Sequence, residues 1–72
     1  MTIRLQGIGW HEAKPARQIK PGDVLVWNYG SKSSVLRIVK ETPAQIIIRE
    51  RYHESGREYN RRLGKDRLVA IQ

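Results

Sequence analysis

Cysteine and phenylalanine are absent from this 72-residue sequence, and no apolar run approaches the length of a membrane span. Without cysteine there is no disulfide framework and no thiolate metal site, which are the usual means of stabilising a very small domain. The first residues, Met1–Arg4, lack the apolar core of a signal peptide. We therefore expect a single domain spanning residues 1–72, located in the cytoplasm and not bound to a membrane.

Acidic residues are scarce relative to basic ones. Fourteen Lys and Arg against seven Asp and Glu give a formal net charge of +7. Such a balance favours polyanionic partners, and nucleic acid is the most common of these. Arginine outnumbers lysine, which suits forked recognition of phosphate or carboxylate. The alternative is a small domain that is basic without a specific partner.

Catalytic and metal-binding patterns are also missing. His11-Glu12 and His53-Glu54 are the only adjacent histidine–carboxylate pairs, and neither has the spacing of a zinc protease. The segment Gly7–Trp10 does not continue into a dinucleotide fingerprint. No acid, base and nucleophile can be assembled. We expect a binding protein, not an enzyme, with no cofactor and no metal.

Turn signals recur at regular intervals, and between them lie short runs rich in β-branched residues. This pattern predicts a mostly β fold, either a small five-stranded SH3-like barrel or a strongly bent antiparallel sheet. A short helical or 3-10 turn at Gly64–Arg67 would precede the last strand. Residues 1–15 would form a loosely attached arm or a strand, and Glu12–Ile19 at most one or two helical turns. The expected strands are Asp23–Asn28, Ser34–Glu41, Gln45–Tyr52, Arg57–Leu63 and Leu68–Ile71.

Two turns suggest how the central strands pair. A two-residue turn at Ser55-Gly56 would place Tyr52 opposite Tyr59, Glu50 opposite Arg61, and Arg49 opposite Arg62. A turn at Thr42–Ala44 would pair Glu41 with Gln45, Ile38 with Ile48, and Arg37 with Arg49. Because side chains alternate between the faces of a sheet, one face becomes the predicted core. It carries Leu36, Ile38, Ile46, Ile48, Leu63, the two tyrosines and the Glu50–Arg61 pair.

The opposite face then aligns Arg37, Arg49 and Arg62 in one row, with Arg51 two residues along. Like charges directly opposite one another destabilise a sheet, so such a row indicates an anion-binding surface if the register holds. A solvated arginine face is the alternative. We predict that phosphates bind Arg37, Arg49, Arg51 and Arg62, with Arg57, Lys65 and Arg67 at the rim.

The aromatic residues are only Trp and Tyr, which keep a polar group on every ring, as interfaces often do. Trp10 and Tyr29 are predicted in loops, and Trp27 in a strand. These three are the candidate aromatic contacts, either stacking on an unpaired base or anchoring a protein partner. Burial as a loop anchor is the alternative for Trp10, and core packing is the alternative for Trp27.

Several strings of this sequence are distinctive when taken together. They are Ala16–Gly30, which contains Pro21-Gly22-Asp23 and the characteristic Trp27-Asn28-Tyr29-Gly30, and the later segments Ser55–Tyr59, Arg61–Leu63 and Asp66–Val69. In these strings the chain resembles small uncharacterised proteins carried by bacteriophages and prophages of high-GC Gram-positive hosts. The resemblance implies a short accessory phage protein and assigns no residue a role.

Two functions are expected from these observations. The first is a nucleic-acid-binding domain of low sequence specificity, for DNA or RNA. The second is a protein-interaction module that docks on an acidic host or phage protein, with arginines steering the encounter. A homodimer whose basic face is incidental is a third possibility, because so small a domain buries little surface.

Overall fold

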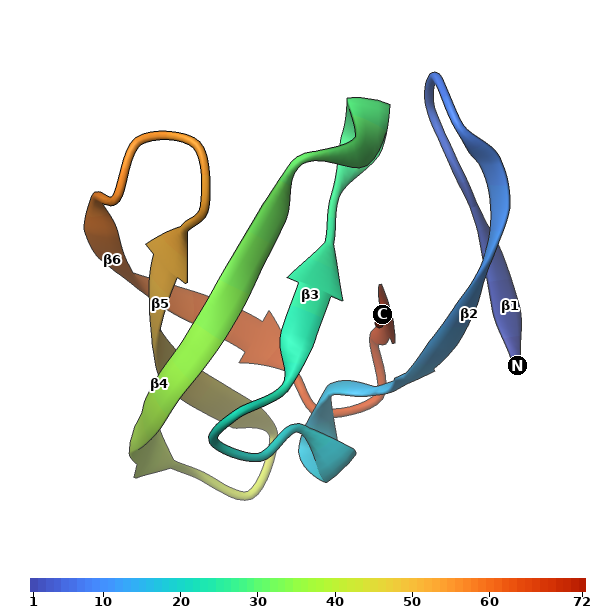
Figure 1. Cartoon of the computed structure of the whole chain (residues 1–72). Coiled ribbons are helices and arrows are strands. Elements are labelled where there is room, and N and C mark those ends of the chain that lie inside the picture. Colours follow the sequence, from blue (N-terminus) through green and yellow to red (C-terminus); the bar gives the residue numbers. More distant parts are fainter.

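Strands make up most of the chain in the computed structural model, which describes all 72 residues (Figure 1). The predicted mostly β fold is confirmed, but seven strands form where five were expected. None of the helical segments is long and apolar enough to cross a membrane. The elements are β1 (Thr2–Leu5), β2 (Gly9–Pro15), η1 (Ala16–Gln18), β3 (Val24–Val26), η2 (Asn28–Gly30), β4 (Lys32–Glu41), β5 (Gln45–Tyr52), β6 (Glu58–Gly64) and β7 (Leu68–Ala70).

The strands form two antiparallel sheets, in the orders β1-β2-β7 and β3-β4-β5-β6. A single bridge between Leu25 and Ile71 joins them. In Figure 1 the β1–β2 hairpin stands apart at the right, and the long strand β4 crosses the front of the four-stranded sheet. The sheets do not close into a barrel, so β6 keeps one unpaired edge.

The first fifteen residues form strands, because β1 and β2 make a hairpin that pairs with the end of the chain. Ala13 lies opposite Ala70, and Pro15 lies opposite Leu68. Within the predicted helical segment, Glu12–Pro15 belongs to β2 and only Ala16–Gln18 turns, as a 3-10 helix. The expected helical turn before β7 is a hydrogen-bonded turn instead, in which Arg67 N donates to Gly64 O (3.1 Å).

The main core lies on the inner side of the four-stranded sheet and is closed by η1 and β7. Its buried members are Ala16, Ile19, Leu25, Val35, Ile46, Ile48, Leu63 and Val69. Burying one large aliphatic side chain contributes about 1.5–3 kcal/mol, so burial of the large aliphatic residues in this cluster stabilises the fold. Ile46, Ile48 and Leu63 were predicted correctly. Leu36 is only partly buried, and Val35 takes its place in the core.

Two β-bulges in β4 explain that exchange. The pairs Arg37–Arg49 and Ile38–Ile48 form as predicted, but the register shifts on either side of them. Glu41 therefore pairs with Ile46 and not with Gln45. Each bulge adds one residue and reverses which face the following side chains occupy. Val35 consequently points inward and Arg37 outward, although they are two residues apart.

The β5–β6 register differs from the prediction by two residues. Four residues, His53–Gly56, form the loop, which is closed by a hydrogen bond from Tyr52 N to Arg57 O (2.9 Å). Gly56 adopts a positive φ of 71°, the conformation that ends such a loop. Arg49 now lies opposite Asn60, and Glu50 opposite Tyr59. Because a slip of two residues preserves the alternation, each side chain remains on its predicted face.

Candidate nucleic-acid interface

The outer side of β4, β5 and β6 carries a cluster of cations that we call the arginine face. Ile46 and Ile48 point into the core, so Ile47, Arg49 and Arg51 point outward, together with their partners on β4 and β6. The charged members of the arginine face are Arg37, Lys40, Arg49, Arg51, Arg62 and Glu58.

The prediction that Arg37, Arg49 and Arg62 lie directly opposite one another in a row is wrong, although all three side chains are on this face. Arg37 and Arg49 are directly opposite, but Arg62 lies opposite Ile47 and Asn60 takes the place next to Arg49. The four-residue loop causes this displacement. Only one arginine pair is directly opposed, which lowers the like-charge repulsion that three in a row would impose.

Lys40 also lies on this face, although the sequence did not predict it there. Its position depends on the second bulge in β4. Ile38 points toward Ile48 and the core, so regular alternation would turn Lys40 inward as well. The register shift between them sets Lys40 opposite Ile47, on the outer side. No bulge signal such as glycine marks this part of β4 in the sequence.

Glu58 and Asn60 orient the two central arginines. Arg51 Nη2 donates to Glu58 Oε2 (2.8 Å), Arg49 Nε donates to Glu58 Oε1 (3.3 Å), and Arg49 Nη1 donates to Asn60 Oδ1 (3.1 Å). Hydrogen bonds from Arg51 and then Arg49 hold the pKa of the Glu58 carboxyl below its ordinary value. The carboxylate is thus charged at neutral pH and compensates one of the two guanidinium groups.

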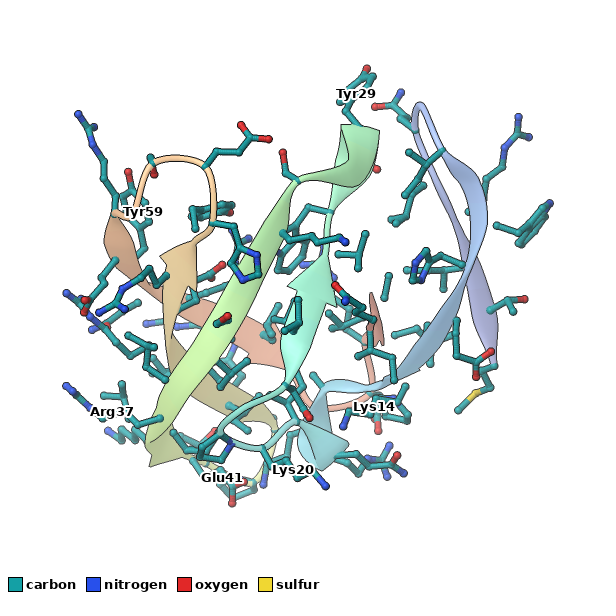
Figure 2. The ribbon with its side chains drawn as sticks, viewed as in Figure 1. Lys14, Lys20, Tyr29, Arg37, Glu41 and Tyr59 are labelled. Atoms are coloured by element: carbon teal, nitrogen blue, oxygen red, sulfur yellow. The ribbon has the colours of Figure 1, made fainter.

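The remaining cations of this face have no ion-pair partner. Arg37, Lys40 and Arg62 form no contact within 4.0 Å with a carboxylate, and all three are exposed. In Figure 2, Arg37 extends away from the body of the molecule at the lower left. The arginine face as a whole therefore keeps a positive charge after its internal pairing.

The three predicted rim residues lie in different places. Arg57 lies between the four-residue loop and β6, where its carbonyl oxygen accepts a hydrogen bond from Tyr52 N (2.9 Å). Lys65 is in the turn after β6, where its Nζ lies 3.8 Å from Glu41. Arg67 lines a small depression that also contains Leu5 and Trp27, toward the other sheet. The structure thus separates Arg67 from the arginine face, and it brings Arg57 next to that face only through its neighbour in the chain, Glu58.

The three aromatic candidates have different surroundings. Trp27 is partly buried against the core, and its Nε1 donates to Ser33 Oγ (3.0 Å). Trp10 is 71% exposed on β2, opposite Arg4, and Tyr29 is 73% exposed. Trp10 is therefore in a strand and not in a loop, and Trp27 packs as a structural residue.

Tyr29 is held in an unusual conformation for an exposed side chain. It is the only non-glycine residue with a positive φ, of 63°. Its N–H donates to Gln6 O (2.6 Å), and Gln6 N donates to Asn28 Oδ1 (2.9 Å), which ties η2 to the β1–β2 turn. Gly7 is required beneath the ring, because a Cβ there would lie 2.6 Å from Tyr29 Cδ1. Tyr29 lies at the top of Figure 2, at the opposite end of the molecule from Arg37.

A polar cluster built around one buried carboxylate occupies the inner side of the same sheet. Glu50 is fully buried, and its Oε2 accepts a hydrogen bond from Arg61 Nε (2.5 Å). Arg61 also donates to Tyr52 Oη and lies over the Trp27 ring, 4.1 Å from its centroid. Tyr52 and Tyr59 pack edge to face, with centroids 5.7 Å apart. The predicted contacts Glu50–Arg61 and Tyr52–Tyr59 both form, as diagonal contacts across the shifted register.

The two histidines lie apart from one another in polar settings. His53 Nε2 and Ser34 Oγ are 2.7 Å apart, and His11 Nδ1 is 3.2 Å from Glu12 O. No group of three or more histidine, aspartate or glutamate residues is arranged to hold a metal ion.

Comparison of the chain with protein-family models, with curated proteins and with solved structures yields no match. Any assignment of function therefore depends on the residues of this chain, their contacts and their charges.

Proposed function

We propose that this chain is a small phage-type accessory protein that binds nucleic acid with low sequence specificity, in the cytoplasm of a host cell. The arginine face carries the proposal. Five cations and a single carboxylate project from three adjacent strands, and three of the cations have no ion-pair partner. An unpaired cationic surface of this kind attracts a polyanion and gains from counterion release.

The residue types explain why we expect low specificity. Guanidinium groups bind phosphate oxygens through two parallel hydrogen bonds, and phosphate contacts carry no sequence information. Base reading in duplex DNA needs an element that enters a groove, such as a helix or a protruding ribbon. The exposed face of a sheet lacks such an element, so it would contact the backbone. We also propose that the two sheets are arranged as in an SH3-like fold.

Fluorescence anisotropy of labelled duplex DNA, single-stranded DNA and RNA over a salt series tests the function. With about three phosphates neutralised, log affinity should fall against log salt with a slope of roughly −3 on duplex DNA. The double variant Arg37→Ala/Arg62→Ala should reduce that slope by about 2. Arg37→Ala alone should reduce the slope by about 1. Arg4→Ala is the matched control for this single variant, because Arg4 is exposed on the other sheet. Absence of binding to all three ligands at low salt would refute the proposal.

Docking on a host or phage protein is the second candidate, and the end of the molecule around Tyr29 favours it. Tyr29 is exposed at this end, and Ile8 and Trp10 are exposed on the adjoining β1–β2 hairpin. Exposed aromatic residues are common anchors of interfaces. A pull-down from nuclease-treated lysate would then return one stoichiometric protein. That protein should be lost with Trp10→Ala or Tyr29→Ala and retained with Arg37→Ala.

A further inference from the structure

An open hollow of about 760 Å³ lies beside the unpaired edge of β6, at the end nearest the β5–β6 loop. Four consecutive residues of the edge strand line it, so the hollow follows the strand and not only one of its faces. Its lining residues are Ser31, Lys32, Glu50, Tyr52, Glu54, Ser55, Tyr59, Asn60, Arg61 and Arg62. Only the two tyrosines are hydrophobic, so the hollow suits a polar ligand with a flat apolar surface.

Tyr59 provides that flat surface. The residue is 45% exposed, and it is labelled at the upper left of Figure 2, on β6. The edge-to-face contact with Tyr52, at an interplanar angle of 77°, fixes the orientation of the ring. Tyr52 is in turn held by the hydrogen bond from Arg61 to its hydroxyl. A ring that is positioned in advance stacks on a ligand at a low entropic cost.

The base of the hollow contains an acceptor without a donor. Glu50 Oε1 is buried and has no hydrogen-bond partner, whereas Oε2 is bonded to Arg61. Leaving such an atom unpaired costs more than an ordinary hydrogen bond contributes, so buried acceptors nearly always have a partner. Because Glu50 lines the hollow, an N–H donor of a bound molecule that reaches Oε1 would supply the missing hydrogen bond.

The hollow is continuous with the arginine face. Asn60 and Arg62 line the hollow and also belong to the outer side of β6. Lys32 stands at the margin formed by the start of β4. A phosphate bound to Arg62 would therefore lie where the arginine face meets the hollow.

We infer that this hollow receives one unpaired nucleobase, which stacks on Tyr59 while Arg62 binds the adjacent phosphate. The preferred substrate is then single-stranded nucleic acid, because a base within a duplex is paired and stacked and cannot enter. The N–H groups of the base are the donors that Glu50 Oε1 lacks. This inference rests on the proposed function and names the class of nucleic acid that it uses.

The test compares Tyr59→Leu with Tyr29→Leu on a single-stranded oligonucleotide and on a duplex of the same length. Both tyrosines are exposed, so neither substitution disturbs the core. Removing one stacking platform should weaken single-strand binding about 5- to 150-fold. Duplex affinity should change less than about twofold, since duplex contacts are made by phosphates alone. Tyr29→Leu should weaken single-strand binding less than Tyr59→Leu does, because Tyr29 does not line the hollow.

A single strand that contains 2-aminopurine gives a second readout, because the fluorescence of this base is quenched when it stacks on an aromatic ring. The wild-type chain should quench it, and Tyr59→Leu should not. If the wild type binds and Tyr59→Leu leaves single-strand affinity and quenching intact, the base site is refuted. The proposal that the arginine face binds nucleic acid is then unaffected. If the wild type binds neither nucleic acid at low salt, the proposed function itself fails. Thermal melting followed by circular dichroism confirms that each variant is folded.

Discussion

Arg61 and Arg62 are neighbours in the sequence and occupy opposite environments. Arg61 points to the inner side of the sheet, where it pairs with buried Glu50, lies over Trp27 and bonds Tyr52. Arg62 points outward, is exposed and has no ion-pair partner. The same residue type thus holds the interior together at one position and remains available to a ligand at the next.

The carboxylates on the two sides of the sheet show the same contrast. Glu50 is fully buried and has one guanidinium group as its partner. Glu58 is exposed and bonds two guanidinium groups of the arginine face. Ion pairs with a buried member are costly to break, whereas exposed ones contribute little to stability. We therefore expect changes on the inner side to affect folding and changes on the outer side to affect binding.

Arg61→Ala should produce the largest effect, because it leaves the buried Glu50 carboxylate without its partner. The expected loss in the free energy of unfolding is about 3 kcal/mol, near the lower end for such pairs since Arg61 is partly exposed. Arg62→Ala should change it by less than about 0.5 kcal/mol. Urea denaturation followed by circular dichroism measures both.

If Arg61→Ala does not fold, the double variant Glu50→Gln/Arg61→Ala keeps the comparison measurable. It removes the unpaired charge and should recover part of the lost stability. Equal stabilities of Arg61→Ala and Arg62→Ala would contradict the division between the two sides.

Glu58→Gln should have an intermediate effect, confined to binding. Without the carboxylate, Arg49 and Arg51 are both free for phosphates, so the salt slope should steepen by up to about 0.9. Glu12→Gln is the matched control, since it changes the net charge equally on the other sheet. If both variants steepen the slope equally, overall charge and not the arginine face governs binding.

The titration of Glu58 should give the smallest and most local effect. Its pKa is lowered by hydrogen bonds from Arg51 and Arg49, so its contribution to stability is present above about pH 4.3 and is lost as the pH falls through the lowered value. NMR of the side-chain carboxyl carbon measures this pKa. Arg51→Ala should return it toward the ordinary value, and an unchanged pKa would show that the pairs do not persist in solution.

Much of the four-stranded sheet was predictable from local pattern. Strand β5 has the predicted bounds, Gln45–Tyr52, and the division of its side chains between core and outer face is correct. Alternation with period two explains this success, since it survives a register error of two residues. The sequence did not predict β1 and β2 as two separate strands. Glycines interrupt that region, and β2 is stabilised by pairing with β7, at the far end of the chain.

The candidate site was only partly predictable for a related reason. Arg49 and Arg51 could be grouped from the alternation of β5 alone. The outward positions of Arg37 and Lys40 depend on two bulges, and the position of Arg62 depends on the length of the β5–β6 loop. The packing of the whole sheet decides where bulges form and how long a loop is. No residue pattern in β4 indicates its two bulges.

The amino-acid sequence alone determined the excess of positive charge, the absence of cysteine chemistry, the strand-forming segments and the two faces of β5. These properties depend on composition or on neighbours along the chain. Tertiary structure decided which arginine points to the inner side of the sheet, which cations share a surface, and that a hollow forms beside Tyr59. Each of these depends on residues that are distant in the sequence, and a single bulge or a loop of four residues is enough to change them.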